Sequence, residues 1–418
     1  MKVYKFGGAS IKNANGIKNV VKILKKFGTD DVLIIVSATG KTTNSLEKVV
    51  KDYIEKSDNL KKSLAKVLMD HIEITRDLFG DNSKSFSKII IDLIKKLENF
   101  LITNKSENYN FIYDQVVSFG ELISSNLINQ YLNFTGIECE LLDARTCIKT
   151  DSYYRDANLN WEFTQKKVIN SIKPKKLYVT QGFIGSDNNN FTTTLGREGS
   201  DYSAAIFGYI LNANEVTIWK DVNGVLNADP RYFKKTELLE NISYTEAIEL
   251  AFYGASVIHP KTLQPLQRKE IPLRVRSFIN LNKKGTIVSK GDNLIKNIPC
   301  YIIKKNQILL SLSALDFSFI VEENISFIFS ELHKYQMRVE LIQNSAISFS
   351  VCINDKYNRL EGLLISLKSK FKIKVFNEVT LYTIRNFDLN SLNSLNEKTS
   401  KILIEQRTKE TLQVVLEK

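Results

Sequence analysis

A pair of glycines follows the first apolar segment of the chain and is suited to binding a phosphate. Gly7 and Gly8 come directly after residues 3–6, whose pattern is typical of a strand. Glycines at a strand-to-helix junction let backbone N–H groups approach an anion closely, and the helix that follows offers its positive end. Lys5, at the end of the strand, can bring an ammonium group to phosphate oxygens. The alternative is an ordinary turn that carries a surface lysine.

A second loop is rich in hydroxyl groups. Residues 36–44 follow a strand-like run, which places them at the carboxyl end of a strand, where α/β folds bind ligands. Gly40, Lys41 and Thr42 imitate the end of a P-loop, but Ile35 stands where that motif requires glycine. We therefore exclude a P-loop and expect a ligand-binding loop of another kind.

Charged and small residues crowd together just before an apolar helix. Arg197, Ser200 and Asp201 lie within six residues that begin at Gly196, and the helix is expected at 204–211. Arginine has a planar fork that matches a carboxylate, and aspartate pairs with an ammonium group. An α-amino acid carries both groups, so this cluster predicts an amino-acid pocket. Helix capping is the alternative, although a cap has no use for the arginine.

Three further segments have simpler alternatives. Glu121 lies at a helix start, where it can also complement the helix dipole. The run 219–231 leaves a strand and turns at an Asn-Gly pair, which suits either a nucleotide cradle or a plain loop. His259 precedes a proline and is expected to be structural. Because the chain has three histidines and four widely spaced cysteines without a CxxC pair, we expect neither a metal site nor disulfides.

The order of elements predicts what holds these loops. Helical stretches such as 16–27 and 121–132 alternate with strand-like runs at 3–6, 32–37, 177–182, 215–220 and 273–277. Strands separated by helices predict an α/β layered domain with a mainly parallel sheet. Residues 45–112 are rich in Lys, Leu and Ile at helical spacing. They predict a helical insertion that packs on this domain as a lid.

The last third of the chain has a different rhythm. Residues 286–299 are polar and predict a linker. A strand, a helix and two strands follow at 308–313, 325–335, 338–342 and 345–353. The pattern returns with a helix at 359–368, strands at 372–377 and 379–385, a helix at 392–405 and a strand at 412–416. Two small β-α-β-β units within 300–418 predict a pair of ligand-sensing modules rather than a second catalytic domain.

Composition restricts the classes of protein that remain. The net charge is +12, but the lysines are spread along the chain rather than gathered in one stripe. We therefore expect no nucleic-acid partner, although a positive field would help to recruit anionic ligands. The longest apolar runs are too short to cross a bilayer, and the N-terminus lacks the apolar core of a signal peptide. We expect a cytoplasmic protein without membrane contact.

Taken together, these segments resemble the aspartate kinase family within the wider group of amino-acid kinases. The resemblance rests on KFGGAS from Lys5, TLGREGSDYSAA from Thr194 and WKDVNGVLNADPR from Trp219. It implies the layered α/β kinase fold, with a mainly parallel sheet, for residues 1–285. Residues 300–418 resemble the paired α+β, ferredoxin-like ACT modules of that family.

The resemblance also implies an activity. Members of the family use ATP and Mg²⁺ to phosphorylate the side-chain carboxylate of L-aspartate, which gives 4-phospho-L-aspartate for lysine, threonine and methionine synthesis. That carboxylate is already ionised near neutral pH, so no general base is needed. The main obstacle is the repulsion between two anions. Because the chain ends at Lys418, we expect no fused dehydrogenase domain.

Residue roles carry over from the matching motifs. Lys5, Arg197 and Asp201 are implied as catalytic residues. The ATP site is implied at Lys5, Phe6, Gly7, Gly8, Ser10, Lys220, Asp221, Leu226 and Arg231. The aspartate site is implied at Ser37, Thr43, Glu121, Arg197, Ser200 and Asp201.

Four positions depart from the family pattern. Glu198 stands where glycine is frequent, Lys220 where threonine is frequent, and Leu226 where an aromatic residue is frequent. Ser256 stands where many members carry lysine. Lys261, about one helical turn further on, is our candidate for an ATP-binding replacement of that charge.

The tail predicts regulation. In the family, ACT modules pair across a homodimer and bind an end-product amino acid, so lysine or threonine is the expected effector. Glu340 is our candidate to hold its ammonium group, and the turn at Asn344 and Ser345 is our candidate to hold its carboxylate. The alternative is a pair of modules that only build the dimer. Two other functions stay open: a kinase that acts on glutamate or acetylglutamate, and a non-catalytic amino-acid sensor.

Overall fold

The computed structural model describes residues 1–255, 258–291, 298–316, 318–388 and 401–417. Two compact units can be distinguished, and each is described by itself. The first contains Met1–Val225, Leu238–Ile248 and Val257–Leu294. The second contains Leu226–Glu237, Glu249–Ser256 and Ile295–Lys418.

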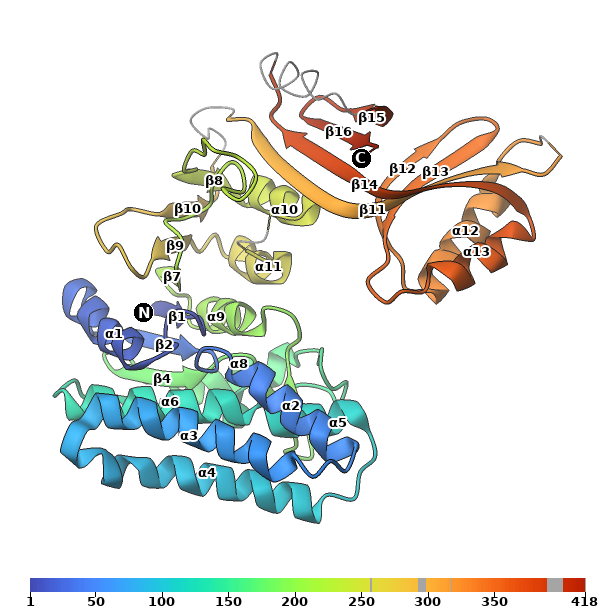
Figure 1. Cartoon of the computed structure of the whole chain (residues 1–418). Coiled ribbons are helices and arrows are strands. Elements are labelled where there is room, and N and C mark those ends of the chain that lie inside the picture. Colours follow the sequence, from blue (N-terminus) through green and yellow to red (C-terminus); the bar gives the residue numbers. More distant parts are fainter. Residues whose placement is uncertain (256–257, 292–297, 317, 389–400, 418) are drawn as a thin grey trace. The chain divides into compact units, whose positions relative to one another are not determined.

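The first unit is built on an eight-stranded sheet (Figure 1), counted over its described residues. In spatial order the strands are β3 (Glu140–Leu142), β4 (Leu177–Gln181), β2 (Val32–Val36), β1 (Lys2–Phe6), β7 (Glu215–Lys220), β9 (Leu273–Ser277), β10 (Thr286–Ser289) and β8 (Asn241–Ser243). The strands from β3 to β9 run parallel, and β10 pairs antiparallel with β9. All five residues of β2 are buried, as expected for a parallel strand that is covered on both faces. The predicted α/β layered fold with a mainly parallel sheet is confirmed.

Helices of the first unit connect and cover these strands. They are α1 (Ala14–Phe27), α6 (Phe119–Phe134), α7 (Ala144–Cys147), α8 (Trp161–Ser171), α9 (Gly199–Ile210), the start of α10 (Tyr244–Tyr253) and α11 (Pro260–Arg268). α6 packs against β2 and β4, whereas α9 packs against β1, β2 and β7. Local sequence explains the ends of α1: the Asn13 side chain accepts a hydrogen bond from the Gly16 N–H, and Gly28 ends the helix at a φ of +94°.

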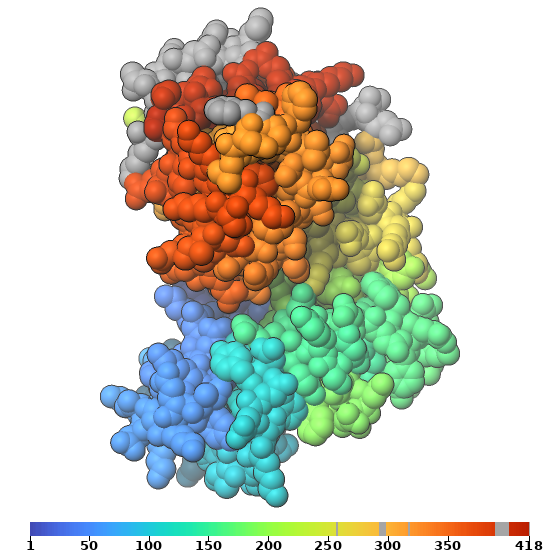
Figure 2. All heavy atoms as spheres, turned by 90° about the vertical axis from the view of Figure 1, so that its right-hand side faces the viewer, coloured from blue at the N-terminus to red at the C-terminus, as the bar shows by residue number. Residues whose placement is uncertain are grey.

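Residues 45–112, expected as a helical insertion, lie in consecutive helices. These are α2 (Thr42–Ile54), α3 (Leu60–Phe79), the short 3₁₀ helix η1 (Gly80–Asn82), α4 (Ser83–Thr103) and α5 (Tyr109–Val117). α3 and α4 run side by side, and α4 packs on α6 (Figure 1). The chain reverses at Gly80, whose φ is +55°. The blue and cyan atoms of this segment gather in one part of the first unit (Figure 2).

The second unit is α+β with an antiparallel sheet. The spatial order is β12 (Arg338–Asn344), β13 (Ser348–Asn354), β11 (Cys300–Ala314), β14 (Phe371–Arg385), β16 (Thr411–Leu416) and β15 (Ile402–Arg407). Helices α12 (Glu322–Lys334) and α13 (Leu360–Lys368) bury Ile328, Leu332, Leu363 and Leu367 against strand residues such as Leu310 and Phe349. The ACT-like character of this region is thereby confirmed.

Three expected elements differ from the structure. The two strands expected at 372–377 and 379–385 form the single strand β14. The helix expected at 392–405 is wrong for Ile402–Glu405, which begin β15, and its remaining described residue, Lys401, is not helical; residues 392–400 lie outside the described residues. Residues 286–289, expected in a linker, form β10, where Val288 is fully buried. In each case pairing with other strands of the sheet overrides the local pattern.

Candidate active site

A buried ionic cluster lies at the end of the first strand. Lys5 Nζ and Asp201 Oδ1 are 2.5 Å apart, and Lys220 Nζ lies 3.4 Å from Asp201 Oδ2. Lys5 is brought to Lys220 because β1 and β7 are adjacent parallel strands, with Phe6 opposite Trp219. Asp201 reaches the cluster from the first turn of α9.

The charges of this cluster are set by burial and pairing. Burial raises the pKa of Asp201, but the ammonium groups of Lys5 and Lys220 outweigh it and hold that pKa below its usual value. Asp201 is therefore ionised at neutral pH. The two ammonium groups beside Asp201 gather positive charge at the ends of β1 and β7, which is suited to attracting an anion such as phosphate.

The Gly7-Gly8 turn is held against the neighbouring loop. The Gly40 N–H donates to the Gly8 carbonyl (3.0 Å), and a Cβ on Gly8 would lie 2.7 Å from the Ala38 carbonyl oxygen. Glycine is thus needed at position 8 for close approach of two backbones. Ser10 is buried and its hydroxyl donates to the Trp219 carbonyl (3.1 Å), so it ties the turn to β7.

The aromatic ring of Phe6 packs beneath the Gly7-Gly8 turn, in the core next to Trp219. Phe6, predicted to take part in the ATP site, has no exposed surface, and its ring stacks on Trp219 at a centroid distance of 6.2 Å. Its observed contacts are those of a core residue that fixes the end of β1.

Glu121 joins the hydroxyl-rich loop to α6. Its Oε1 accepts from the Ala38 N–H (3.0 Å), while its Oε2 is buried and has no hydrogen-bond partner among the described residues. Burial raises the pKa of Glu121 to about 8, against smaller opposing effects that include the charge of Lys5. The Ser124 hydroxyl donates to the Ser37 carbonyl (2.7 Å) and holds the same turn. The raised pKa favours the protonated form of Glu121, and its Oε2 is the oxygen that a ligand could contact.

The loop before α9 has a strained backbone. Gly196 has a φ of +78°, and Glu198, the residue before the helix, has a φ of +53°. This left-handed conformation favours glycine, which explains why glycine is frequent at position 198 in the family that the sequence resembles. Arg197 between them is exposed, and no ion pair of its guanidinium is found within the described part of the chain. Ser200 is buried against Gly182, where a Cβ would lie 2.6 Å from Ser200 Cβ.

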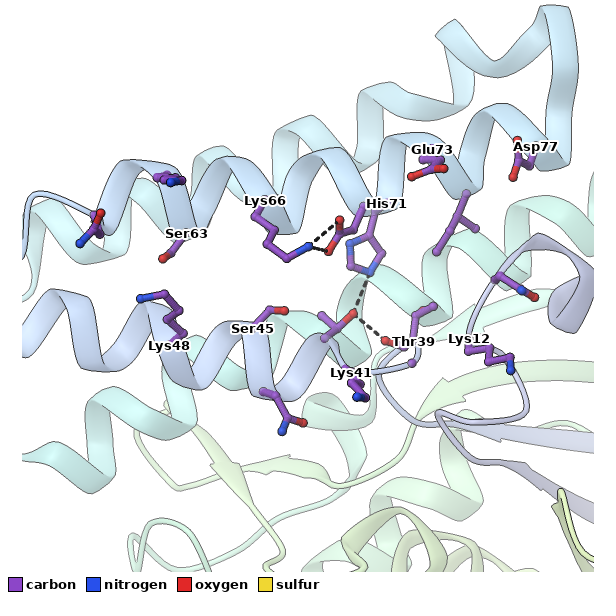
Figure 3. Close-up of a pocket in the computed structure, with 18 residues that line it drawn as sticks. Lys12, Thr39, Lys41, Ser45, Lys48, Ser63, Lys66, His71, Glu73 and Asp77 are labelled. Carbon is purple, nitrogen blue, oxygen red and sulfur yellow. Dashed lines mark hydrogen bonds and ion pairs between the residues drawn. The ribbon is translucent and has the colours of Figure 1, made fainter.

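A cavity of about 920 Å³ lies on the other side of the hydroxyl-rich loop. Its lining includes Thr39, Lys41 and Lys12 together with the facing sides of α2 and α3 (Figure 3). His71 of α3 reaches across to Thr42, whose hydroxyl donates to the Thr39 carbonyl (2.6 Å). Lys5, Glu121 and Asp201 do not line this cavity, so we place the candidate site at the ionic cluster.

For three predicted residues near these loops, the structure gives the position and exposure. Ser37 and Thr43 are half-buried at the end of β2 and in the first turn of α2. Asp221 is exposed and follows Lys220 directly. Their roles remain predictions.

Lys261, predicted to bind ATP, makes its observed contacts outside the ionic cluster of Lys5, Asp201 and Lys220. Lys261 pairs with Asp156 (2.5 Å), and His259 Nδ1 accepts from the Lys261 N–H (3.2 Å) at the start of α11. His259 is thus a helix cap, which confirms its structural role. Ser256 lies outside the described residues.

Leu226 and Arg231 belong to the second unit. Arg231 pairs there with Asp229, with Nη2 and Oδ2 2.6 Å apart. Their proposed contact with a nucleotide is a prediction that neither unit by itself tests.

The proposed effector residues also lie in the second unit. The side chain of Glu340 is 7% exposed and pairs with Lys304 and with Arg338, whose Nε lies 3.0 Å from Oε1. The Ser345 N–H already donates to the Ser348 carbonyl (2.8 Å) in the β12–β13 turn, of which Asn344 is the last strand residue. An effector would have to compete with these contacts, so the assignment of this pocket remains a prediction.

Sequence reasoning missed Asp114, a buried residue that positions the loop of Arg197. Its carboxylate accepts from the Arg155 N–H (3.0 Å) and from the Thr194 N–H and hydroxyl (2.8 Å each). Thr194 ends β6 (Thr192–Thr194), two residues before Gly196. Burial raises the pKa of Asp114 to about 6. The sequence feature that could have pointed to Asp114 is its position as the one carboxylate among the apolar residues of α5.

Metal-binding clusters and membrane-spanning helices are both absent from the described residues. These residues contain no group of three or more His, Cys, Asp and Glu side chains that could hold a metal ion. In the same residues, no helix is both long and apolar enough to cross a membrane.

Comparisons with known proteins identify the family of the chain. The model of the amino acid kinase family matches residues 1–277. The bifunctional aspartokinase/homoserine dehydrogenase 2 of Arabidopsis thaliana is 35% identical over 295 residues, which are 68% of this chain and 32% of that protein. The chain thus spans about a third of the length of this relative.

Two bacterial comparisons cover nearly the whole chain. The lysine-sensitive aspartokinase 3 of Escherichia coli is 27% identical over 421 residues, covering 96% of this chain and 90% of that protein. The crystal structure of E. coli aspartokinase III in complex with aspartate and ADP superimposes with a TM-score of 0.80 at 25% identity, covering 100% of this chain and 96% of that one.

Proposed function

We propose that this chain, which belongs to the amino acid kinase family, is an aspartate kinase that transfers the γ-phosphoryl group of ATP to the side-chain carboxylate of L-aspartate. Its similarity to a lysine-sensitive aspartokinase extends over 96% of the chain, and a related structure of similar fold contains aspartate and ADP. The observation that carries the proposal is the buried cluster of Lys5, Asp201 and Lys220, which offers preorganised positive charge at the carboxyl end of β1 and β7.

Lys5 is proposed to neutralise the transferring phosphoryl group. Asp201 holds its ammonium group in place before any substrate arrives, so little reorganisation is needed during the reaction. Because both side chains are buried, the positive charge acts in a medium of low dielectric constant, where it stabilises an anionic transition state more strongly than water would. The backbone of Gly7 and Gly8 would approach the phosphates closely.

The acceptor is proposed to lie between Arg197 and Glu121. The fork of Arg197 is exposed and can grip a carboxylate of the amino acid. The Oε2 atom of Glu121, which has no partner among the described residues, can accept a hydrogen bond from the ammonium group of the bound amino acid. A bound ammonium favours the ionised carboxylate, so substrate binding would release the proton of Glu121. The attacking carboxylate of aspartate is already ionised, so its reaction needs no base.

Mg²⁺ is proposed to enter with ATP. The ion binds mainly through nucleotide phosphates and one or two carboxylates, which fits a chain whose described residues contain no cluster of metal ligands. Asp221, the exposed carboxylate next to Lys220, would help to hold it, and the ion would supply positive charge to the phosphates.

Regulation by an amino acid is the finer part of the proposal. An ACT-like second unit and a lysine-sensitive relative support lysine as the effector, with threonine as the alternative. A homodimer formed through the second unit, cytoplasmic localisation and the roles of the product in lysine, threonine and methionine synthesis belong to the same proposal.

The deciding experiment is turnover by the purified full-length chain. ATP, Mg²⁺ and L-aspartate should yield ADP together with an acyl phosphate that hydroxylamine converts to a hydroxamate. L-glutamate and N-acetylglutamate should support little turnover. If either of them is turned over faster than aspartate, that amino acid is the substrate instead. If none of the three is turned over, the chain is a sensor without catalytic activity.

A further inference from the structure

A second polar cavity lies in the first unit and shares no lining residue with the candidate active site. Its volume is about 470 Å³, a size suited to a small metabolite. The side chains come from α7, α8 and the turn after β5 (Ile184–Ser186). The lining residues that matter for its chemistry are Arg145, Lys149, Phe163, Lys167, Asp187 and Asn190.

The central feature is a buried lysine. Lys149 is only 9% exposed, and its ammonium donates to Ser186 Oγ (2.6 Å) and Asn190 Oδ1 (3.3 Å). Because the Ser186 hydroxyl itself donates to the Arg145 carbonyl (2.7 Å), its oxygen is oriented to accept from the ammonium. Among the described residues no carboxylate forms an ion pair with Lys149. A buried charge held only by neutral groups is costly unless a counter-ion binds.

The carboxylate of Asp187, in the cavity wall, already accepts four hydrogen bonds. Asp187 Oδ1 accepts from the N–H groups of Asn189 and Phe191 (2.9 Å each). Its Oδ2 accepts from the hydroxyls of Ser152 (3.0 Å) and Tyr154 (3.1 Å). Four hydrogen bonds occupy the acceptor sites of a carboxylate, so Asp187 shapes the turn and does not pair directly with a neighbouring ammonium.

Other groups that face the cavity are also donors. Lys167 is exposed on α8, and its Nζ lies 5.4 Å from the centroid of the Phe163 ring. Arg145 binds Asp143 through Nε and Nη2, which leaves its Nη1 for another acceptor. Burial lowers the pKa of Lys149, and the nearby charge of Lys167 lowers it further. The charges of Asp187 and Asp143 act in the opposite direction, but they do not outweigh burial and Lys167, so an anion bound between Lys149 and Lys167 would be favourable.

We propose that this cavity binds a phosphate group, either free or as the monoester of a small metabolite, through Lys149, Lys167 and the amide of Asn190. Lysine ammonium groups bind phosphate as point charges, and donors that reach the cavity from separate segments suit a tetrahedral oxyanion. The inference does not rest on the proposed kinase activity. The cavity lies at the turn of the β5–β6 hairpin, next to the pair of Ser186 and Thr192, so a bound phosphate would also hold the hairpin that leads to Arg197.

The test is thermal unfolding of the full-length chain in inorganic phosphate at constant ionic strength, with and without saturating ADP. ADP occupies any phosphate site of the nucleotide cleft, so a rise in Tm that persists in ADP reports the second cavity. Lys167→Ala should weaken the apparent affinity for phosphate by about tenfold or more, and Lys149→Met should abolish the rise. Lys166→Ala is the matched control, because Lys166 is exposed on the same helix, pairs with Glu162 and does not line the cavity.

Two further arms identify the source of the ligand. Glycerol 3-phosphate that binds more tightly than inorganic phosphate would identify a phosphate monoester, and equal or weaker binding would identify the free ion. The proposal is overturned if phosphate leaves the Tm of the ADP-saturated wild type unchanged, if Lys149→Met responds like wild type, or if succinate binds and phosphate does not. Should Lys149→Met fail to fold, the comparison of Lys167→Ala with Lys166→Ala decides.

Discussion

Lys5 and Asp201 form a buried ion pair, with Nζ and Oδ1 2.5 Å apart, although one lies at the end of the first strand and the other in the first turn of α9. Asp201 thereby fixes the ammonium group of Lys5 at the carboxyl end of β1, next to the loop that follows β7. Removing either partner would leave a buried charge that is incompletely compensated. The following predictions test this arrangement and the loops around it.

Lys5→Ala should lower kcat by about 10²-fold or more, because it removes a preorganised electrostatic contact with the transferring group. ADP production at saturating ATP and aspartate measures the effect. Lys2→Ala, on the same strand but outside the cluster, is the control and should keep near-normal kcat. A Lys5→Ala protein that folds and turns over normally would contradict the catalytic assignment.

Arg197→Lys should raise the KM for aspartate strongly and the KM for ATP little. Lysine keeps the positive charge but loses the planar fork that grips a carboxylate. Steady-state kinetics with each substrate varied in turn separates the two effects. A larger change in the KM for ATP would move Arg197 to the nucleotide site.

The stability of the protein should fall between about pH 4.5 and about pH 8 because of Glu121. Its pKa is raised to about 8 in the folded chain by burial, from an ordinary value of 4.5. The folded state therefore binds more protons than the unfolded state in this window, so its contribution is complete below the unfolded pKa and is lost as pH rises through the folded pKa. Tm measured against pH for wild type and Glu121→Gln checks this, and parallel curves would refute it.

Gly8→Ala should destabilise the fold by about 1–3 kcal/mol and lower activity, because the new Cβ would lie 2.7 Å from the Ala38 carbonyl oxygen and force two backbones apart. Gly291→Ala is a suitable control, since a Cβ at Gly291 meets no described residue within 4 Å. Urea unfolding of both variants gives the free energies. Equal stability of the two would show that the loops separate without cost.

Lysine should inhibit the wild-type enzyme, and Glu340→Ala should reduce that inhibition if Glu340 binds the effector. In the structure Glu340 pairs with Lys304 and Arg338. The variant therefore also tests whether the ammonium group of the effector displaces these two side chains from Glu340. Activity is titrated with lysine and threonine, singly and together. Equal inhibition of both forms would keep the regulation but exclude this pocket, and indifference of wild type to both amino acids would exclude feedback.

Local sequence sufficed for features that depend on neighbours in the chain. The five apolar residues of β2 are all buried, and they form a parallel strand inside the sheet, as their pattern predicts. The Gly7-Gly8 turn follows β1 as expected, and His259 caps α11 beside Pro260. The helix expected at 392–405 failed at its described end, because Ile402–Arg407 satisfy their backbone groups by pairing with β16 instead.

What the sequence by itself determined is therefore the set of elements and the motifs at their ends, from which the family could be inferred. Only the tertiary structure decided which charged groups meet: Asp201 meets Lys5 and Lys220. Among the residues that the structure describes, Glu121 keeps one oxygen without a hydrogen-bond partner, and Lys149 forms no ion pair with a carboxylate. The physical reason is that a helix or strand follows from contacts a few residues apart. Burial and electrostatic pairing instead depend on segments that are far apart in sequence and meet only when the chain has folded.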